Sequence, residues 1–516
     1  MMPPFIQRLA VTFSALALAT VLVSCGGGGG GSGVDSGGSV QAQGKGTVGI
    51  LLTDMPADPA QFAAIIASII KVELMGSDEN GPVTLYSGPA KEFDLLRLRN
   101  ESIPLAFKDN VPAGTYCKIR LILSDLELVL TDSTPSVLSD NETDHPKLPG
   151  NGKLDLVARD CFNVVDGEVL GLQLDIDAAK SIHVIEKGNC SSKGNKSCFN
   201  FRPVVFVDVV NKDFKSKLVR LEGEITEIYS DGLLLCDAVP SKDMDNLGCA
   251  RIHFGGESAF FDNSPAPKGN DGKPTAISKL LVDANIGEDL TVVGWVKSWA
   301  SQDNFDDNKP EEYHPLLYLE ALVAELGEFL QVEGTVAISA DLKGFEMEVA
   351  SGGPVLTDST LAVIYQPGEA GINGTRIVSK AGELLGPLDV TEPLPVQVDG
   401  TLQLMTGFDP LLKAALIIID KDTLGVEQVT GVIQSVGTST LELTPEADTV
   451  CGVATSPIMV DLTRDVKVWT ITITNDSYTI APDGTLKEQQ TVFMNGTCEL
   501  TGYQTDNVAI VEDERL

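Results

Sequence analysis

The sequence predicts an all-β protein that consists of a β-sandwich followed by three small β-barrel repeats. Short segments in which apolar and polar residues alternate occur along the chain, for example at residues 118–123 and 126–130, and this period of two is typical of strands with one buried face. Gly, Pro, Asn and Asp separate these segments, as expected for turns. Beyond residue 216 the pattern repeats about every 100 residues, which is the size of a domain.

The chain begins with the features of an exported lipoprotein precursor. Arg8 precedes an almost wholly apolar stretch, residues 9–23, which is typical of a signal-peptide core and too short for a comfortable membrane span of about 20 residues. Residues 22–25, Leu-Val-Ser-Cys, resemble the bacterial lipobox. The resemblance implies that residues 1–24 are a signal peptide and that Cys25 becomes the lipidated first residue, carrying palmitate or a related fatty acid.

Residues 25–45 are rich in glycine and serine, which predicts a flexible tether with a root-mean-square reach of roughly 25 Å. Two or three acyl chains anchor a protein firmly where one is marginal. We therefore expect the lipid bilayer of the cell envelope to be a partner. Gly26, rather than aspartate, follows the lipidated position, and by resemblance to known sorting this favours the outer membrane, facing the periplasm or the cell surface. The alternative is an ordinary cleaved signal peptide with a cysteine nearby.

The composition narrows the classes of partner. The chain has 516 residues and a net charge of −36, with 37 basic and 73 acidic residues. Such a polyanion is repelled by nucleic acid, so we expect no nucleic-acid partner. Aromatic residues make up only 6% of the chain, which is a low content for a surface that stacks on sugars or bases. A solvated acidic surface is the simplest interpretation of the charge.

The predicted sandwich occupies residues 46–215. Between its two alternating segments the apolar phase slips by one at Ser124 and Asp125, which predicts a bulge or a turn. Residues 62–74 are ambiguous, because an alanine-rich start favours a helix while Ile70, Val72 and Leu74 alternate as in a strand.

Five segments occur in the order found in a family of exported bacterial proteins: residues 51–58 (LLTDMPAD), 93–98 (FDLLRL), 111–123 (VPAGTYCKIRLIL), 172–182 (LQLDIDAAKSI) and 201–205 (FRPVV). They resemble the family catalogued as domain of unknown function 4382. The resemblance implies a transthyretin-like β-sandwich that is often found on lipoproteins, and it implies no activity.

The three predicted barrels occupy residues 216–327, 328–421 and 422–516. Each repeat has one glycine inside its first apolar strand and a second glycine late in the repeat, at Gly223 and Gly294, Gly334 and Gly400, and Gly431 and Gly496. Glycine inside a strand often marks a bulge or a barrel corner. The repeats resemble a second exported family of unknown function, catalogued as 5666, which implies OB-like barrels.

Eight cysteines follow Cys25: Cys117, Cys161, Cys190, Cys198, Cys236, Cys249, Cys451 and Cys498. An even number of cysteines in an exported chain predicts disulfides, and each predicted domain holds an even number. Parity then pairs Cys236 with Cys249 and Cys451 with Cys498. The sandwich leaves three pairings; Cys190 and Cys198 bracket a short polar loop, so we pair these two and leave Cys117 with Cys161.

Four aspartates are weak candidates for a Ca²⁺ site, since Ca²⁺ takes six to eight oxygen ligands: Asp54, Asp94, Asp175 and Asp177. Asp175 and Asp177 share the outer face of a strand whose apolar residues face the core. Roles in solvent or in turn capping are the stronger interpretation.

Gly44–Gly49 spells G-x-G-x-x-G, but it begins a strand after a tether and so is no dinucleotide site. The acidic segment 303–312 is expected to be a solvated hairpin.

Motifs that indicate a catalytic or metal site are sparse. The histidines are His145, His183, His253 and His314, and no two have metal-ligand spacing. No H-E-x-x-H, C-x-x-C or G-x-S-x-G is present. We therefore expect no cofactor and a non-enzymatic role in binding or adhesion to an envelope or extracellular ligand. A structural envelope spacer and an enzyme with a dispersed site are the alternatives.

Overall fold

The computed structural model divides the chain into two units, Met1–Ala42 and Gln43–Leu516. All described residues belong to the second unit. No described helix is long and apolar enough to cross a membrane. The structure describes residues 44–54, 62–76, 81–98, 100–130, 143–177, 181–184, 199–201, 204–210, 218–239, 248–264, 271–299, 314–351, 360–380, 382–403, 410–420, 426–445, 449–450, 453–454, 457–463, 466–474, 478–482, 484–499 and 502–513.

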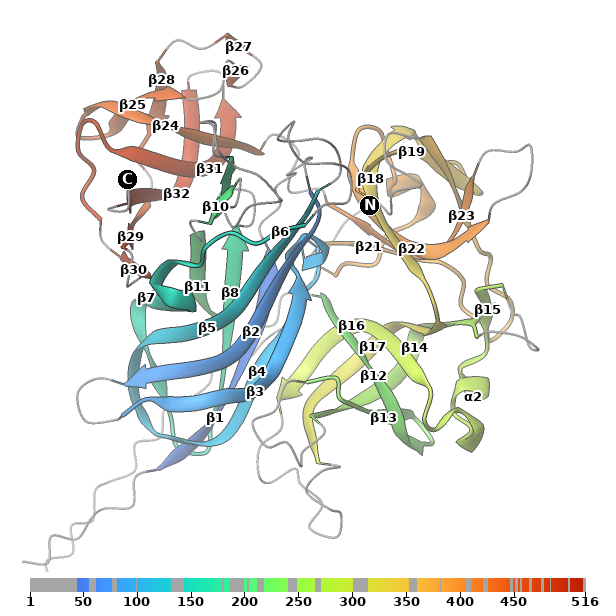
Figure 1. The fold of residues 1–516 in the computed structure, drawn as a ribbon. Coiled ribbons are helices and arrows are strands. Elements are labelled where there is room, and N and C mark those ends of the chain that lie inside the picture. The colour runs from blue at the N-terminus through green and yellow to red at the C-terminus, as the bar shows by residue number, and fades with distance from the viewer. Residues whose placement is uncertain are drawn as a thin grey trace, which may run out of the picture. The chain divides into compact units, whose positions relative to one another are not determined.

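The described part is all-β, as predicted, and it begins with a β-sandwich (blue to green in Figure 1). One of its sheets has the strand order β11-β8-β1-β4. The central pair, β1 and β8, is parallel, while the outer strands are antiparallel to them. The four strands are β1 (Lys45–Asp54), β4 (Ile103–Pro112), β8 (Val169–Asp177) and β11 (Val204–Val210).

The second sheet of the sandwich is antiparallel and has the order β7-β5-β2-β3. Its strands are β2 (Phe62–Gly76), β3 (Val83–Asp94), β5 (Gly114–Leu130) and β7 (Lys153–Val164). The ambiguous stretch 62–74 is therefore a strand. Ser68 pairs with Asp125 and Ile69 pairs with Leu123, so Ser124 is the extra residue of the predicted bulge.

The core of the sandwich lies between the two sheets. Val48, Ile50 and Leu52 alternate along β1 and are fully buried, and Val72 and Leu74 of β2 belong to the same apolar cluster. This alternation places every second residue of β1 on the opposite face. Gly49 and Leu51 occupy that face, and Leu51 is buried in a different apolar cluster.

Three five-stranded barrels follow, each with the same strand order. Around each barrel the strands follow the order first, second, third, fifth, fourth, and the fourth pairs with the first. The third and fifth strands are parallel to each other, and their pairing closes the barrel. This order is that of the predicted OB-like barrel. The strands are β12 (Leu218–Tyr229), β13 (Gly232–Cys236), β14 (Cys249–Asn263), β16 (Asp289–Trp299) and β17 (Pro315–Gly327); β18 (Leu330–Ile338), β19 (Gly344–Ser351), β20 (Thr360–Tyr365), β22 (Pro395–Gln403) and β23 (Leu411–Ile419); and β24 (Val426–Val436), β25 (Thr440–Pro445), β28 (Ile458–Asp461), β31 (Thr491–Glu499) and β32 (Gly502–Asp513).

The repeated glycines occupy equivalent positions, as predicted. Gly223 on the first strand faces Leu290, and Gly294 on the fourth strand faces Val219. The residue opposite Gly223 is therefore four positions before Gly294, and the residue opposite Gly294 is four positions before Gly223. The same register recurs in the other two barrels, where Gly334 faces Val396, Gly400 faces Leu330, Gly431 faces Val492 and Gly496 faces Glu427.

The second glycine of each pair marks a bulge against the fifth strand. A Cβ atom added at Gly294 would lie 2.1 Å from the carbonyl oxygen of Glu320, and one at Gly400 would lie 2.3 Å from that of Lys413. The neighbouring backbone therefore leaves no room for a side chain at either position, which is the physical reason for a glycine inside the strand.

The C-terminal barrel also pairs with the sandwich. Its extra hairpin consists of β29 (Lys467–Ile473) and β30 (Tyr478–Pro482), and β30 runs parallel to the edge of β7. Trp469 belongs to the apolar cluster of the sandwich. The second sheet of the sandwich therefore continues into the last barrel as one sheet of twelve strands.

The remaining elements are short. They are the strands β6 (Thr143–Asp144), β9 (Ile182–Val184), β10 (Phe199–Phe201), β15 (Lys273–Thr275), β21 (Arg376–Ser379), β26 (Thr449–Val450) and β27 (Val453–Ala454), the helical turn α2 (Ile277–Leu280), and the 3-10 turns η1 (Leu95–Leu98), η2 (Pro149–Gly152), η3 (Asp283–Asn285) and η6 (Pro387–Asp389).

Candidate functional site

The predicted lipidation site, Cys25, lies outside the described residues, and so does the acidic segment 303–312. Cys190, Cys198 and Cys451 also lie outside them. Cys498 belongs to β31, but its side chain is not described. The predicted pairs Cys190–Cys198 and Cys451–Cys498 therefore stay predictions.

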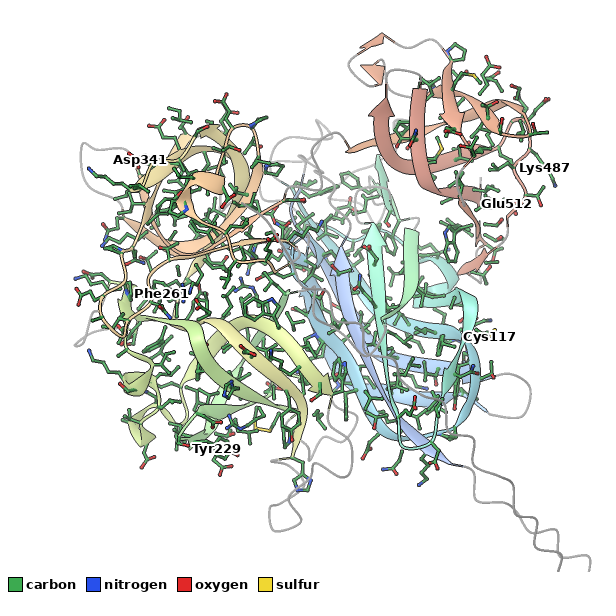
Figure 2. The ribbon with its side chains drawn as sticks, turned by 180° about the vertical axis from the view of Figure 1, so that it is seen from behind. Cys117, Tyr229, Phe261, Asp341, Lys487 and Glu512 are labelled. Atoms are coloured by element: carbon green, nitrogen blue, oxygen red, sulfur yellow. A yellow bond between two sulfur atoms is a disulfide. The ribbon has the colours of Figure 1, made fainter. Side chains whose placement is uncertain are left out.

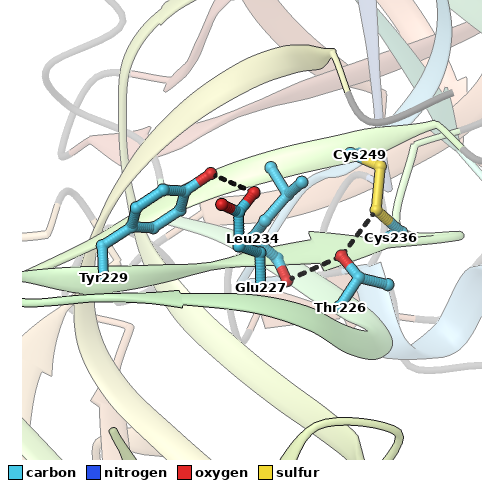
Figure 3. Close-up of a disulfide and its surroundings, with 6 residues drawn as sticks. All are labelled: Thr226, Glu227, Tyr229, Leu234, Cys236 and Cys249. Carbon is cyan, nitrogen blue, oxygen red and sulfur yellow. Dashed lines mark hydrogen bonds between the residues drawn. A yellow bond between two sulfur atoms is a disulfide. The ribbon is translucent and has the colours of Figure 1, made fainter. Parts of the chain in front are cut away.

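Two of the predicted disulfides are present. Cys117 of β5 is bonded to Cys161 of β7, and Cys236 of β13 is bonded to Cys249 of β14. The Cα atoms are 4.2 Å and 3.9 Å apart, respectively, so each bond links neighbouring strands within one module. Figure 3 shows that Thr226 Oγ lies beside the second bond, 3.1 Å from Cys236 Sγ.

The same view shows how the first barrel is braced around that disulfide. Thr226 Oγ donates to the carbonyl oxygen of Leu234 at 3.3 Å, and Tyr229 Oη donates to Glu227 Oε2 at 2.7 Å. Arg251 stacks on the Tyr229 ring, with its guanidinium carbon 4.1 Å from the ring centroid. The disulfide is therefore structural, since hydrogen bonds and packing surround it.

The four candidate aspartates do not form a described metal site. Asp94 caps a turn instead: its Oδ1 accepts hydrogen bonds from the amides of Ile65 at 3.1 Å and Leu96 at 3.2 Å. Burial raises the pKa of Asp94, while these hydrogen bonds and Arg97 act in the opposite direction. Capping was the stronger of the two interpretations of the sequence.

The other three aspartates lie on adjacent strands of the opposite sheet. Thr53 pairs with Asp175, and Asp54 pairs with Ile176. The side chains of Asp54 and Asp177 are not described. Within the described part of the chain, no group of three or more His, Cys, Asp or Glu residues is arranged to hold a metal ion.

A cluster of buried charges joins three modules, and we call it the Arg220 junction. It consists of Arg220 and Glu325 of the first barrel, Asp399 and Gln397 of the second barrel, and Glu101 of the sandwich. Glu101 is 1% exposed, and Glu325 and Asp399 are each 2% exposed. Three carboxyl groups from three modules therefore face one guanidinium.

The guanidinium of Arg220 makes most of the contacts. Its Nε donates to Glu101 Oε2 at 2.8 Å and its Nη2 donates to Glu101 Oε1 at 3.1 Å, which is a two-pronged bond. Nη2 also donates to Asp399 Oδ2. Glu325 Oε2 lies 3.9 Å from Nη1. Burial disfavours the charged guanidinium, but the carboxyl groups of Asp399, Glu101 and Glu325 outweigh it and raise the pKa of Arg220 well above its usual value.

Amide side chains extend the junction. Gln397 Nε2 donates to Glu101 Oε2 at 3.1 Å, and Gln397 Oε1 accepts from Asn100 Nδ2 at 3.1 Å. Backbone pairing accompanies these bonds, because the Ser102 amide donates to the Leu218 carbonyl at 2.9 Å and the Arg220 amide donates to the Ser102 carbonyl at 3.0 Å. Ser102, which directly precedes β4, is thus bonded to the start of β12.

Negative charge exceeds positive charge in the Arg220 junction. Burial, together with repulsion from Asp399 and Glu101, raises the pKa of Glu325 well above its usual value, although Arg220 opposes this rise. Burial likewise raises the pKa of Glu101, against the attraction of Arg220. Glu325 Oε1 has no hydrogen-bond partner among the described residues. Both raised pKa values favour the protonated form of the carboxyl groups in the junction.

An apolar contact also lies between the sandwich and the first barrel. The Trp299 ring of β16 stacks on Phe107 of β4, with the ring centroids 5.6 Å apart. A Cβ atom added at Gly49 would lie 2.4 Å from the Trp299 ring, so this glycine lets the indole approach the sandwich sheet. Leu51 joins the same cluster. The outer face of β1 is therefore covered by the first barrel.

A second apolar cluster joins the first and second barrels. It contains Phe261 of β14, which Figure 2 labels, together with Val293, Leu322, Leu416 and Ile418. All five side chains are buried. Burial of these side chains stabilises the contact by the hydrophobic effect.

Inspection of the sequence missed the Arg220 junction, although a signal was present. Glu325 lies within the buried run 321–326 of β17, and Asp399 lies within the buried run 396–401 of β22. A charged residue inside a strand that is apolar on both faces indicates a buried partner. The partner, Arg220, precedes Glu325 by 105 positions and Asp399 by 179 positions in the sequence.

Comparison with known families assigns the N-terminal part. Residues 45–198 match a family model described as Domain of unknown function (DUF4382). The sandwich carries a DUF4382 domain. The match includes Glu101 and both cysteines of the Cys117–Cys161 bond, whereas Arg220 lies beyond it. No curated protein and no solved structure matches the chain. The resemblance of the barrels to a second exported family stays a prediction.

Proposed function

We propose that this chain is an exported protein, lipid-anchored at the cell envelope through Cys25, that acts as a non-catalytic binding or adhesion module. The anchor is supported by the lipobox at residues 22–25 and by the glycine-rich tether after it. Gly26 supports sorting to the outer membrane.

One observation favours a binding platform over a flexible spacer: the modules are joined by buried contacts. A flexible envelope spacer consists of modules that move independently, and such modules share small and polar interfaces. Here the Arg220 junction, the Trp299 contact and the strand pair β7–β30 join the sandwich to all three barrels. Modules joined in this way present their loops in a fixed relation to a partner.

The alternative of an enzyme with a dispersed site receives less support. Carboxyl groups with raised pKa values converge at the Arg220 junction, which is a feature of many active sites. However, Glu101, Glu325 and Asp399 are at most 2% exposed, so a substrate has no access to them in this structure. The arrangement suits a structural role.

Replacing Cys25 by Ala tests the anchor. Cells that express the wild-type chain should incorporate labelled palmitate into it, and the protein should fractionate with the outer membrane. The C25A variant should remain an unlabelled, uncleaved precursor. Cys117→Ser is the matched control, because it removes a cysteine of the sandwich and should keep the label. Equal labelling of C25A and wild type would overturn the proposal.

A further inference from the structure

A hollow on the second barrel is not used by any role described above. It lies where three segments meet: the turn after β18, the loop between β20 and β21, and residues 384–387. Its volume is about 260 Å³, slightly below the roughly 300–1,000 Å³ of pockets for drug-sized molecules. A ligand for this hollow is therefore small.

The rim of the hollow is apolar and exposed. Leu342 is 76% exposed and Leu384 is 43% exposed, and Leu385, Pro367 and Pro387 line the hollow beside them. Exposed leucines scattered singly are ordinary, but a group of them around one concavity indicates a surface that binds an apolar group. Burial of this rim by a ligand is favourable by the hydrophobic effect.

Arg376 is the one charged residue among the residues that line the hollow. Its Nη2 is 3.2 Å from Glu257 Oε2, while its Nε has no hydrogen-bond partner among the described residues. The side chain is 16% exposed. Arg376 is thus ion-paired with Glu257, which does not line the hollow, so Arg376 is the cation that the lining offers to an anion.

Tyr365 lies on the wall beside Arg376. Its hydroxyl has no hydrogen-bond partner within the described part of the chain. Burial, together with the negative charge of Asp341, which Figure 2 labels, raises the pKa of Tyr365. The hydroxyl therefore keeps its proton and can donate a hydrogen bond. Arg376 Nε and Tyr365 Oη, which both lack a hydrogen-bond partner among the described residues, are thus both donors.

The loop that carries these residues is held firmly. Gln366 is 7% exposed, and its Nε2 donates to the carbonyl oxygens of Gly272 at 2.8 Å and Ala414 at 3.2 Å. Thr375 Oγ donates to the same Ala414 carbonyl at 2.6 Å. Both ends of the loop are thereby fixed to β23, which places Tyr365 and Arg376 at the hollow before any ligand binds.

We propose that this hollow binds a small carboxylate with a short apolar tail. The tail lies against Leu342, Leu384 and the prolines. Arg376 Nε and Tyr365 Oη are buried in the free protein, and both side chains turn toward the carboxylate when it binds. A charge-assisted bond to a guanidinium is stronger than one between neutral groups. The inference deepens the binding role proposed above and rests on it, since it names the class of ligand.

Titration of the purified protein without residues 1–25, which removes no described residue, tests the site. The probes are hexanoate, 1-hexanol and hexylamine, which share one tail and differ in the head group. Ligand-detected NMR should give hexanoate at least about tenfold tighter binding than 1-hexanol, because a hydrogen bond between charged groups is stronger than one to a neutral group. Hexylamine should bind most weakly.

Two variants locate the binding. Arg376→Gln should remove the preference for hexanoate over 1-hexanol. Tyr365→Phe should weaken hexanoate binding about 2- to 10-fold and leave the thermal midpoint of the free protein unchanged or raised, because the phenol loses a hydroxyl without a described partner. Arg97→Gln is the control, since Arg97 lies in η1 of the sandwich and is 65% exposed.

Equal binding of hexanoate and 1-hexanol by the wild type would overturn the inference, and so would a hexanoate preference that survives in folded Arg376→Gln. If Arg376→Gln does not fold, the comparison of the three probes and the Tyr365→Phe variant still decide. Failure here leaves palmitate labelling and membrane fractionation unaffected, so it is distinguishable from failure of the proposed lipid-anchored role.

Discussion

The two contacts between the sandwich and the first barrel differ in their chemistry. At the Trp299 contact, an indole stacks on Phe107 and fills the space over Gly49. At the Arg220 junction, a guanidinium forms a two-pronged bond to Glu101 and also bonds Asp399. Apolar burial is favourable but has no direction, whereas a two-pronged bond fixes distance and angle.

The comparison suggests a division of roles. A buried ion cluster adds little net stability, because removing its charges from water is costly, but breaking it by removing one partner is strongly destabilising. We infer that the Trp299 contact supplies most of the attraction between the two modules. The Arg220 junction sets their orientation and makes it depend on protonation.

Removal of the cation should have the largest effect. Arg220→Ala leaves Glu101, Glu325 and Asp399 together without a counter-charge, and we expect a loss of about 3–5 kcal/mol in the free energy of unfolding at neutral pH. Denaturant titration followed by circular dichroism measures it on the first transition, in which the modules separate. Arg97→Ala, at an exposed arginine of the sandwich, should change the value by less than about 0.5 kcal/mol. Similar losses for both variants would refute the importance of the junction.

The disulfide in the first barrel separates stability within a module from stability between modules. Replacing Cys236 and Cys249 together by Ser removes a bond that closes a separation of 13 residues. By the loop-closure relation this should cost about 3 kcal/mol. Because the bond lies inside one barrel, the dependence of stability on pH should stay as in the wild type. A changed dependence on pH would show that the disulfide supports the Arg220 junction.

The apolar contact can be weakened by adding one methyl group. Gly49→Ala places a Cβ atom within 2.4 Å of the Trp299 ring, and overpacking of this kind costs about 1–3 kcal/mol. Combining it with Trp299→Leu should cost less than the sum of the two single changes, because the smaller side chain leaves room for the methyl group. Additive losses in a double-mutant cycle would mean that the two residues do not meet in solution.

The protonation of the Arg220 junction predicts the smallest but most specific effect. The pKa of Glu325 is raised in the folded protein above its ordinary 4.5, so the folded protein holds a proton that the unfolded chain releases. Stability should therefore fall as pH rises from 4.5 to the raised folded-state pKa. Glu325→Gln, which stays neutral, should flatten this fall. Parallel pH profiles of wild type and Glu325→Gln, measured by denaturant titration, would contradict the assignment.

The sequence predicts the modules better than the contacts between them. The glycine pairs correctly predict three equivalent barrels, because a glycine inside a strand is a local demand that each repeat must satisfy. The phase slip at Ser124 correctly predicts the bulge for the same reason. The alternation at residues 62–74 was ambiguous, and pairing with β5 on one side and β3 on the other makes this segment a strand.

The Arg220 junction could not be predicted in this way, since its members are brought together only by tertiary packing. Glu101 and Arg220 are separated by 119 positions, and Arg220 and Asp399 by 179. The four aspartates illustrate the opposite case, in which local chemistry is informative. They were weak candidates for Ca²⁺ with turn capping as the stronger interpretation, and Asp94 caps a turn at Ile65 and Leu96.

Calorimetric unfolding of the protein without residues 1–25 measures whether the buried junctions make the sandwich and the barrels one cooperative body. The wild type should unfold in one transition whose calorimetric and van't Hoff enthalpies agree. Arg220→Ala should divide this transition into at least two. Separate transitions of the modules already in the wild type would mean that the junctions do not couple them.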